Sequence, residues 1–104
     1  MVVSRQREII ESPLSLGHDE KIAYPLDITN WGSDPTVITV AVKDSEGEDV
    51  STTHLTGTAS VVNPTTILLP FIHSLVAGKL YRLEVKFTID SNIVECWAAL
   101  NGEE

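Results

Sequence analysis

The stretch Leu75-Val76-Ala77-Gly78-Lys79-Leu80-Tyr81 is the most informative about the fold, because a long strand begins at its end. From residue 81 to residue 90 apolar and polar residues alternate strictly, and the apolar ones are Tyr81, Leu83, Val85, Phe87 and Ile89. Successive side chains on a strand point to opposite faces, so this pattern predicts a long strand with one buried face. A leucine, a glycine turn and a tyrosine at the start of such a strand are the sequence form of a tyrosine corner. In that corner the phenol bonds back to the crossover of a Greek-key sandwich. We therefore assign structural roles to Leu75, Gly78 and Tyr81.

Shorter segments with turn signals between them fill the rest of the chain, and together they predict seven or so strands. The expected strands are 21–29, 38–43, a brief edge strand at 50–53, 58–62, 65–69 and 93–100, with residues 101–104 as a tail. Near the start, Glu8-Ile9-Ile10 and Ser12-Pro13-Leu14 suggest an edge strand broken in two, because proline cannot donate to a ladder. The pattern predicts an all-β Greek-key sandwich that forms one domain over residues 1–104.

Strict alternation also predicts which side chains form the core. A slip of one residue would turn every apolar group outward, so the inward set is well specified. The expected core residues are Ile22, Tyr24, Leu26, Ile28, Ile38, Val40, Val42, Tyr81, Leu83, Val85 and Phe87.

Charge and composition disfavour several classes of partner. Seven Lys and Arg face fifteen Asp and Glu, a formal net charge of −8, which repels nucleic-acid backbones and anionic membrane surfaces. No apolar run reaches the length of a membrane span or a signal peptide. The single cysteine, Cys96, cannot close an intrachain disulfide, which fits a reducing compartment. We expect a cytoplasmic or virion-associated protein rather than a secreted one.

No motif for catalysis, a cofactor or a metal is found. His18, His54 and His73 lie far apart, which leaves a zinc site unsupported, and we expect two surface or loop residues and one crossover residue. The acidic run 44–49 fails the EF-hand spacing and is interpreted as a solvated hairpin tip, the alternative being a loop site that includes Asp34. Cys96 lies among apolar strand residues and is expected to be a small buried hydrophobe. We predict that the chain is not an enzyme.

The two tryptophans leave two interpretations open. Trp31 and Trp97 could form a recognition platform near loops, or they could fill the core, and we favour the core for both because aromatic residues are few. If a platform exists, Trp31 and Asp34 in the loop Asn30–Pro35 are its candidate binding residues.

With these residues in view, the chain resembles small immunoglobulin-like or fibronectin-III-like proteins of phages and prophages. The resemblance lies in Glu20 with Tyr24-Pro25-Leu26-Asp27-Ile28-Thr29-Asn30-Trp31, and in Ile72 with Leu75-x-x-Gly78-x-x-Tyr81-x-Leu83-x-Val85, about a third of the chain. It departs from that pattern by a short tail after Leu100, which leaves the end of the last strand open. The resemblance implies a structural or accessory virion component with no catalytic residues.

Two functions follow as expectations. The first is a non-catalytic structural or protein-binding module, derived from a phage or prophage, that contacts other protein subunits. The alternative is a cell-surface adhesion or carbohydrate-binding sandwich that uses Trp31 and the loops beside it.

Overall fold

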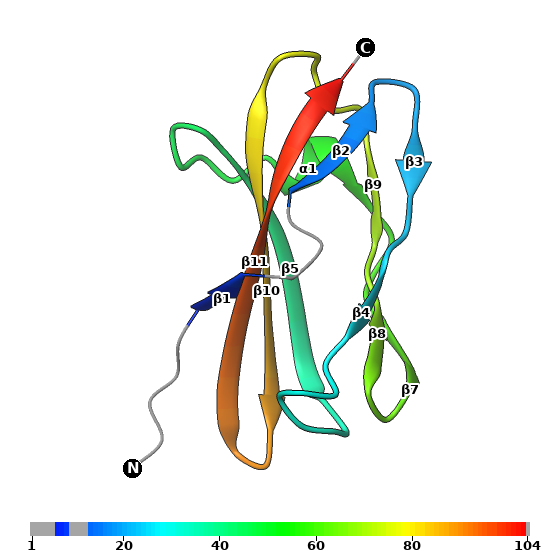
Figure 1. Ribbon diagram of the computed structural model, residues 1–104, viewed down its shortest axis with the longest axis vertical. Helices are drawn as coiled ribbons and strands as arrows, with labels where there is room; N and C mark the ends of the chain where they lie inside the picture. Colours follow the sequence, from blue (N-terminus) through cyan, green and yellow to red (C-terminus); the bar gives the residue numbers. More distant parts are fainter. Residues whose placement is uncertain (1–5, 9–12, 104) are drawn as a thin grey trace.

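The computed structural model describes residues 6–8 and 13–103, and this part of the chain is all-β apart from one helical turn (Figure 1). Its strands are β1 (Gln6–Glu8), β2 (Leu14–Gly17), β3 (Lys21–Ile22), β4 (Pro25–Asp27), β5 (Thr36–Asp44), β6 (Leu55–Thr56), β7 (Ser60–Asn63), β8 (Thr66–Leu68), β9 (Phe71–His73), β10 (Leu80–Ile89) and β11 (Asn92–Glu103). The helical turn is α1 (Ser51–His54). No helix in the described residues has the length and apolar character that crossing a membrane requires.

The strands form two layers that face each other (Figure 1). The first layer is one sheet in the order β1, β11, β10, β5, and β2 pairs with the far half of β11. The second layer consists of two short sheets, β3–β9–β6 and β4–β8–β7. The backbone bond from Leu69 N–H to the Tyr24 carbonyl joins these two sheets where the strands are interrupted. If interrupted strands are taken together, the chain crosses the two layers in seven positions.

The first crossing is the interrupted edge strand that the sequence predicts. β1 pairs in parallel with residues 95–97 of β11, and β2 pairs in parallel with residues 100–103. Both pieces therefore lie along the same side of one strand, and Pro13 immediately precedes the second piece. The predicted segment at 9–12 lies outside the described residues.

The end of the last strand and the segment at 50–53 differ from the sequence prediction. The last strand does not end at Leu100, because residues 101–103 continue β11 and pair with β2. The expected edge strand at 50–53 is replaced by α1. There the Ser51 hydroxyl donates to Asp49 and accepts a hydrogen bond from Val42 N–H, so side-chain bonding turns the chain where pairing was expected.

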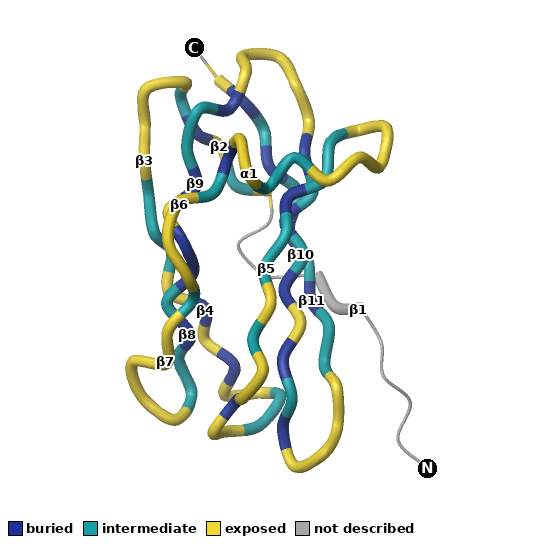
Figure 2. Tube along the Cα trace, turned by 180° about the vertical axis from the view of Figure 1, so that it is seen from behind, coloured by how far each residue is buried: buried dark blue, intermediate teal, exposed yellow. Residues whose placement is uncertain are grey.

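The core lies between the two layers, and buried residues alternate along β10 and β11 (Figure 2). Seven of the predicted core residues are buried, namely Leu26, Ile28, Val42, Tyr81, Leu83, Val85 and Phe87. The other four are half-buried and pack against that core, namely Ile22, Tyr24, Ile38 and Val40. Leu16, Ile67, Leu69, Ile72, Leu75, Ile89, Cys96, Ala98 and Leu100 complete it.

The predicted tyrosine corner is present. Tyr81 is 6% exposed, and its hydroxyl accepts a hydrogen bond from the backbone N–H of Val76 over 3.1 Å. Leu75 is fully buried beside this bond. Gly78 has φ = +81°, a conformation that glycine adopts without a steric cost, and its N–H donates to the carbonyl of Gly102. The corner thus joins the crossover to the ends of both long strands.

Gly102 allows β11 to approach the corner closely. A Cβ atom at this position would overlap the Val76 carbonyl and lie 2.7 Å from its carbon. The Gly102 N–H also donates to the Lys79 carbonyl over 2.9 Å. Val76 is therefore held from two sides, by the Tyr81 hydroxyl and by the backbone of β11.

Candidate functional site

Trp31 lies in the turn after β4 and faces the core. The backbone N–H of Trp31 donates to the carbonyl of Ile28 over 2.8 Å. The indole ring stacks on Phe87 with a centroid separation of 6.2 Å and an interplanar angle of 28°. The residue is half-buried and packs against the core cluster. The preferred core role of Trp31 is therefore confirmed. Because Phe87 covers part of the ring, the structure gives the platform function no specific support.

Asp34 lies further along the same loop and is exposed. Its backbone has φ = +55°, and its N–H donates to the carbonyl of Pro64 over 2.7 Å. This bond fastens the loop to the turn between β7 and β8. The backbone of Asp34 thus has a structural contact, and no described hydrogen bond or ion pair joins its side chain to Trp31.

Trp97 does not lie in the core, so that prediction is wrong. Its neighbours Cys96 and Ala98 are buried on the inner face of β11, and alternation therefore places Trp97 on the outer face of the first layer. There the Arg82 guanidinium lies over the indole, 4.4 Å from the ring centroid. Arg82 Nε is 3.3 Å from Glu84 Oε2. We call Trp97, Arg82 and Glu84 the Trp97 cluster.

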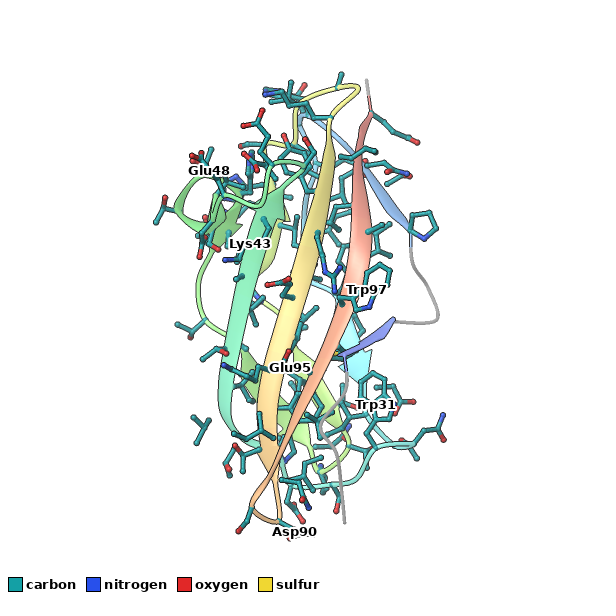
Figure 3. All side chains as sticks on the ribbon, turned by 90° about the vertical axis from the view of Figure 1, so that its left-hand side faces the viewer. Trp31, Lys43, Glu48, Asp90, Glu95 and Trp97 are labelled. Atoms are coloured by element: carbon teal, nitrogen blue, oxygen red, sulfur yellow. The ribbon has the colours of Figure 1, made fainter. Side chains whose placement is uncertain are left out.

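Strand register places the Trp97 cluster at the centre of a charged face. Glu84 pairs with Trp97 on one side and with Ala41 on the other, and the flanking cross-strand rows are Lys43–Arg82–Ala99 and Thr39–Lys86–Glu95. Trp97, Glu95 and Lys43 are labelled on this side of the molecule in Figure 3. The basic residues between positions 13 and 103 are Lys21, Lys43, Lys79, Arg82 and Lys86, and three of these five lie on this face. The face is thus less acidic than the chain as a whole.

A shallow hollow of about 190 Å³ adjoins the Trp97 cluster. The small side chains of Thr39 and Ala41 on β5 line it, and Lys43, Lys86 and Glu95 stand around it. The hollow meets the cluster at Glu84, and its charges of both signs can orient a protruding side chain of a partner. Arginine and tryptophan are also the residue types that most often dominate protein–protein binding.

His54 and His73 have structural contacts. His54 is 5% exposed, which corrects the expectation of a surface residue, and its ring lies edge-on to Tyr81 at a centroid separation of 4.8 Å. Its Nδ1 is 3.2 Å from the His73 carbonyl oxygen, so Nδ1 carries the proton and donates. His73 lies in β9 rather than in the crossover, and both of its ring nitrogens have partners, Thr56 and Ser74. His18 is exposed, as predicted.

The acidic tip 44–49 uses two of its carboxylates to shape the chain. Asp44 Oδ1 accepts the N–H groups of Glu46 and Glu48, each over 2.9 Å. Asp49 Oδ1 accepts both the N–H and the hydroxyl of Ser51, and these two bonds, aided by Lys43, lower the pKa of Asp49 below its ordinary value of 3.8. In residues 6–8 and 13–103 no three or more His, Cys, Asp or Glu side chains are grouped to hold a metal ion.

Two further carboxyl and phenol groups have shifted acidity for local reasons. The hydroxyl and then the N–H of Thr29 lower the pKa of Asp27. Burial, followed by the charge of Glu20, raises the pKa of Tyr24. Neither group belongs to the Trp97 cluster: the Asp27 shift comes from hydrogen bonds in the turn after β4, and the Tyr24 shift comes mainly from burial.

Comparison with known proteins adds no relative to this description. No protein-family model matches the chain, and neither a curated protein nor a solved structure matches it.

Proposed function

We propose that the chain is a non-catalytic, protein-binding structural module with an immunoglobulin-like Greek-key sandwich. The strand order supports this fold. Numbering the seven crossings A to G along the chain, the second layer has the order B–E–D and the first contains C–F–G, the arrangement of immunoglobulin-like sheets. The first crossing departs from the constant-type order, because it pairs with G rather than with B.

The observation that carries the proposed function is the Trp97 cluster on the outer face of the first layer. The indole of Trp97 lies on the outer face of this sheet and is only half-buried there. Arg82 covers the ring at 4.4 Å, and Glu84 holds Arg82. A pre-ordered aromatic and arginine pair loses little side-chain freedom when a partner covers it, which favours binding.

Binding is favoured over catalysis because the side chains with reactive chemistry have structural contacts. Cys96 is 1% exposed in the core, and the nitrogens of His73 bond to neighbouring hydroxyls. His54 is enclosed between Tyr81 and the His73 backbone. None of these groups faces the Trp97 cluster in the register of the first layer.

The resemblance to phage-type sandwich proteins supports a more specific role, that of a structural or assembly subunit that contacts other virion proteins. Its two sequence segments correspond to β4 with its exit turn and to the tyrosine corner. We therefore propose that the partners of this chain are other virion proteins.

The experiment measures affinity for the subunits encoded by the genes that flank the gene of this chain. Each subunit is immobilised, and the wild-type domain is compared with Trp97→Ala. We expect Trp97→Ala to bind at least tenfold more weakly, since central aromatic residues often dominate an interface.

Phe71→Ala is the matched control. Phe71 is an exposed aromatic on the other layer, and it too lies beneath a cation, with Lys21 Nζ 5.1 Å from its ring centroid. This variant should bind as the wild type does. A folded Trp97→Ala domain with wild-type affinity would refute the proposed binding face.

A further inference from the structure

One side of β5 is an open sheet edge between Thr39 and Ala41. Within the described residues β5 pairs with β10 in a register that is continuous from Asp44 to Thr39, and its other side carries only the isolated bridge between Lys43 and Asp49. Val42 N–H donates to the Ser51 hydroxyl, and the Val42 carbonyl accepts from Val50 N–H, so both groups point away from β10. Backbone direction repeats every two residues, so the N–H and carbonyl of Val40 point the same way. Within the described residues no hydrogen bond reaches either group.

An apolar groove lies beside this edge. It has a volume of about 320 Å³, and its apolar lining comes from Ile38, Val40, Leu55, Ala59 and Pro70. These residues belong to β5 in the first layer and to β6 and its neighbours in the second, and Figure 2 shows β5 and β6 facing each other from the two layers. The groove can therefore receive side chains from a segment that hydrogen-bonds to Val40.

Val37 lies at the N-terminal end of the β5 edge. It has φ = +51° and is 76% exposed, both unusual for a β-branched residue. It lies where β5 has one residue more than β10, since Thr39 is opposite Lys86 and Thr36 is opposite Thr88. A bulge of this kind ends regular pairing. An exposed valine held in a strained conformation is typical of a contact surface rather than of a feature kept for stability.

The C-terminal end of the β5 edge, at Val42, determines which kind of segment can pair with it. Val50 and Ser51 already lie beside Val42. If β5 of a second copy paired antiparallel at Val40, its Ile38 would need that same position. Such pairing of β5 with β5 of a second copy is therefore excluded, whereas a short extended segment that stops before Val42 is accommodated. The acidic tip, with Asp44, Glu46, Glu48 and Asp49, follows directly and favours a basic residue at that end of the segment.

We propose that the β5 edge binds an extended segment of another polypeptide, with apolar side chains at alternate positions and a basic residue near the acidic tip. Main-chain bonds to Val40 would give affinity, and the groove would select the alternate side chains. This inference rests on the proposed function, a protein-binding module, and adds a second surface to it.

The test uses a synthetic eight-residue peptide in which valine and threonine alternate between terminal lysines. Amide signals of the whole protein are followed by NMR during titration. We expect saturable binding, shifts confined to the residues of the β5 edge and groove, and at least tenfold slower hydrogen exchange at the Val40 amide. A peptide of the same sequence, methylated on alternate backbone nitrogens, should not bind.

Two variants test the mechanism by separate routes. Val40→Pro removes the free donor but leaves the bonds of β5 to β10, because the Val40 N–H points away from β10. Ala59→Phe fills the groove without changing β5. Each should weaken peptide binding more than tenfold, whereas Phe71→Ala should leave it unchanged.

The proposal is overturned if the Val40 amide keeps its exchange rate at millimolar peptide, or if folded Val40→Pro and Ala59→Phe both bind as the wild type does. The result is independent of the Trp97 cluster, because the peptide should not shift the Trp97 indole signal. If the wild-type domain does not bind the peptide but still shows Trp97-dependent subunit binding, this inference is refuted and the proposed function stands.

Discussion

The Tyr81 hydroxyl accepts the backbone N–H of Val76 over 3.1 Å, and this bond joins the crossover between the two layers to the start of β10. The phenol is 6% exposed, so a lost bond leaves the Val76 N–H with poor access to water. We predict that Tyr81→Phe lowers the free energy of unfolding by about 1–2 kcal/mol. Urea denaturation measures this directly.

Tyr24→Phe is the control for that measurement. Tyr24 is half-buried against the core, and no described hydrogen bond reaches its hydroxyl. Removal of the Tyr24 hydroxyl should change the free energy of unfolding by less than about 0.5 kcal/mol. Equal effects of the two substitutions would mean that the Tyr81 bond contributes nothing specific.

Gly102→Ala should destabilise the domain by about 1–3 kcal/mol, because the new methyl group would overlap the Val76 carbonyl and force the backbone apart. The comparison is Gly17→Ala in the strand paired with this part of β11. There the new Cβ would lie 3.4 Å from Glu20 Oε1 and 3.9 Å from the Glu103 carbonyl oxygen, which are ordinary contact distances. Thermal unfolding that ranks Gly17→Ala as the more harmful change would contradict the close approach of β11 to the corner.

The turn between β10 and β11 offers a stabilising substitution. Asp90 and Ser91 both have positive φ, +48° and +67°, between the paired residues Ile89 and Asn92. Such a two-residue turn favours Asn-Gly. We expect the double change Asp90→Asn and Ser91→Gly to raise the free energy of unfolding by about 0.5–1 kcal/mol, as the left-handed strain is relieved.

Ser45→Gly serves as the control for this turn. Ser45 lies in the other long hairpin tip but is not among the residues with positive φ. Glycine should therefore bring no gain at this position, because it only adds freedom to the unfolded chain. If Ser45→Gly raised the free energy of unfolding as much as the double change at Asp90 and Ser91, relief of left-handed strain would not be the cause.

Asp49 should make stability depend on acidity. Its hydrogen bonds from Ser51 lower the carboxyl pKa, so the folded state favours the ionised form. The stabilising contribution is present above the ordinary pKa and is lost as the pH falls through the lowered value. The stability difference between the wild type and Asp49→Asn should therefore shrink on acidification from about pH 5 to about pH 2.

Ser51→Ala provides a separate check on the same bond. It keeps the Asp49 carboxylate but removes the hydroxyl that lies between Val42 and Asp49. Its acid profile should resemble that of Asp49→Asn more than that of the wild type. A constant stability difference between the wild type and Asp49→Asn at every pH would refute the assigned cause.

The long strand, the corner and most of the core could be predicted because period two leaves no choice of face. The end of β11 could not be predicted, since residues 101–103 have no apolar pattern and become a strand only through β2 and the close approach at Gly102. α1 depends on hydroxyl and carboxylate bonds at Ser51 and Asp49, which alternation does not report. The same alternation that turns Leu100 inward also places Trp97 on the outer face. Its assignment to the core rested on its being a large aromatic residue and was therefore wrong.

Binding of protein partners through the Trp97 cluster can be followed at the two indole N–H signals of the domain. Substitution of each tryptophan assigns them, and the subunits encoded by flanking genes are then added to the labelled protein. We predict that the Trp97 signal shifts or broadens with saturation, while the signal of Trp31, which is stacked on Phe87, does not shift. A Trp31 signal that responds while Trp97 remains unchanged would contradict it.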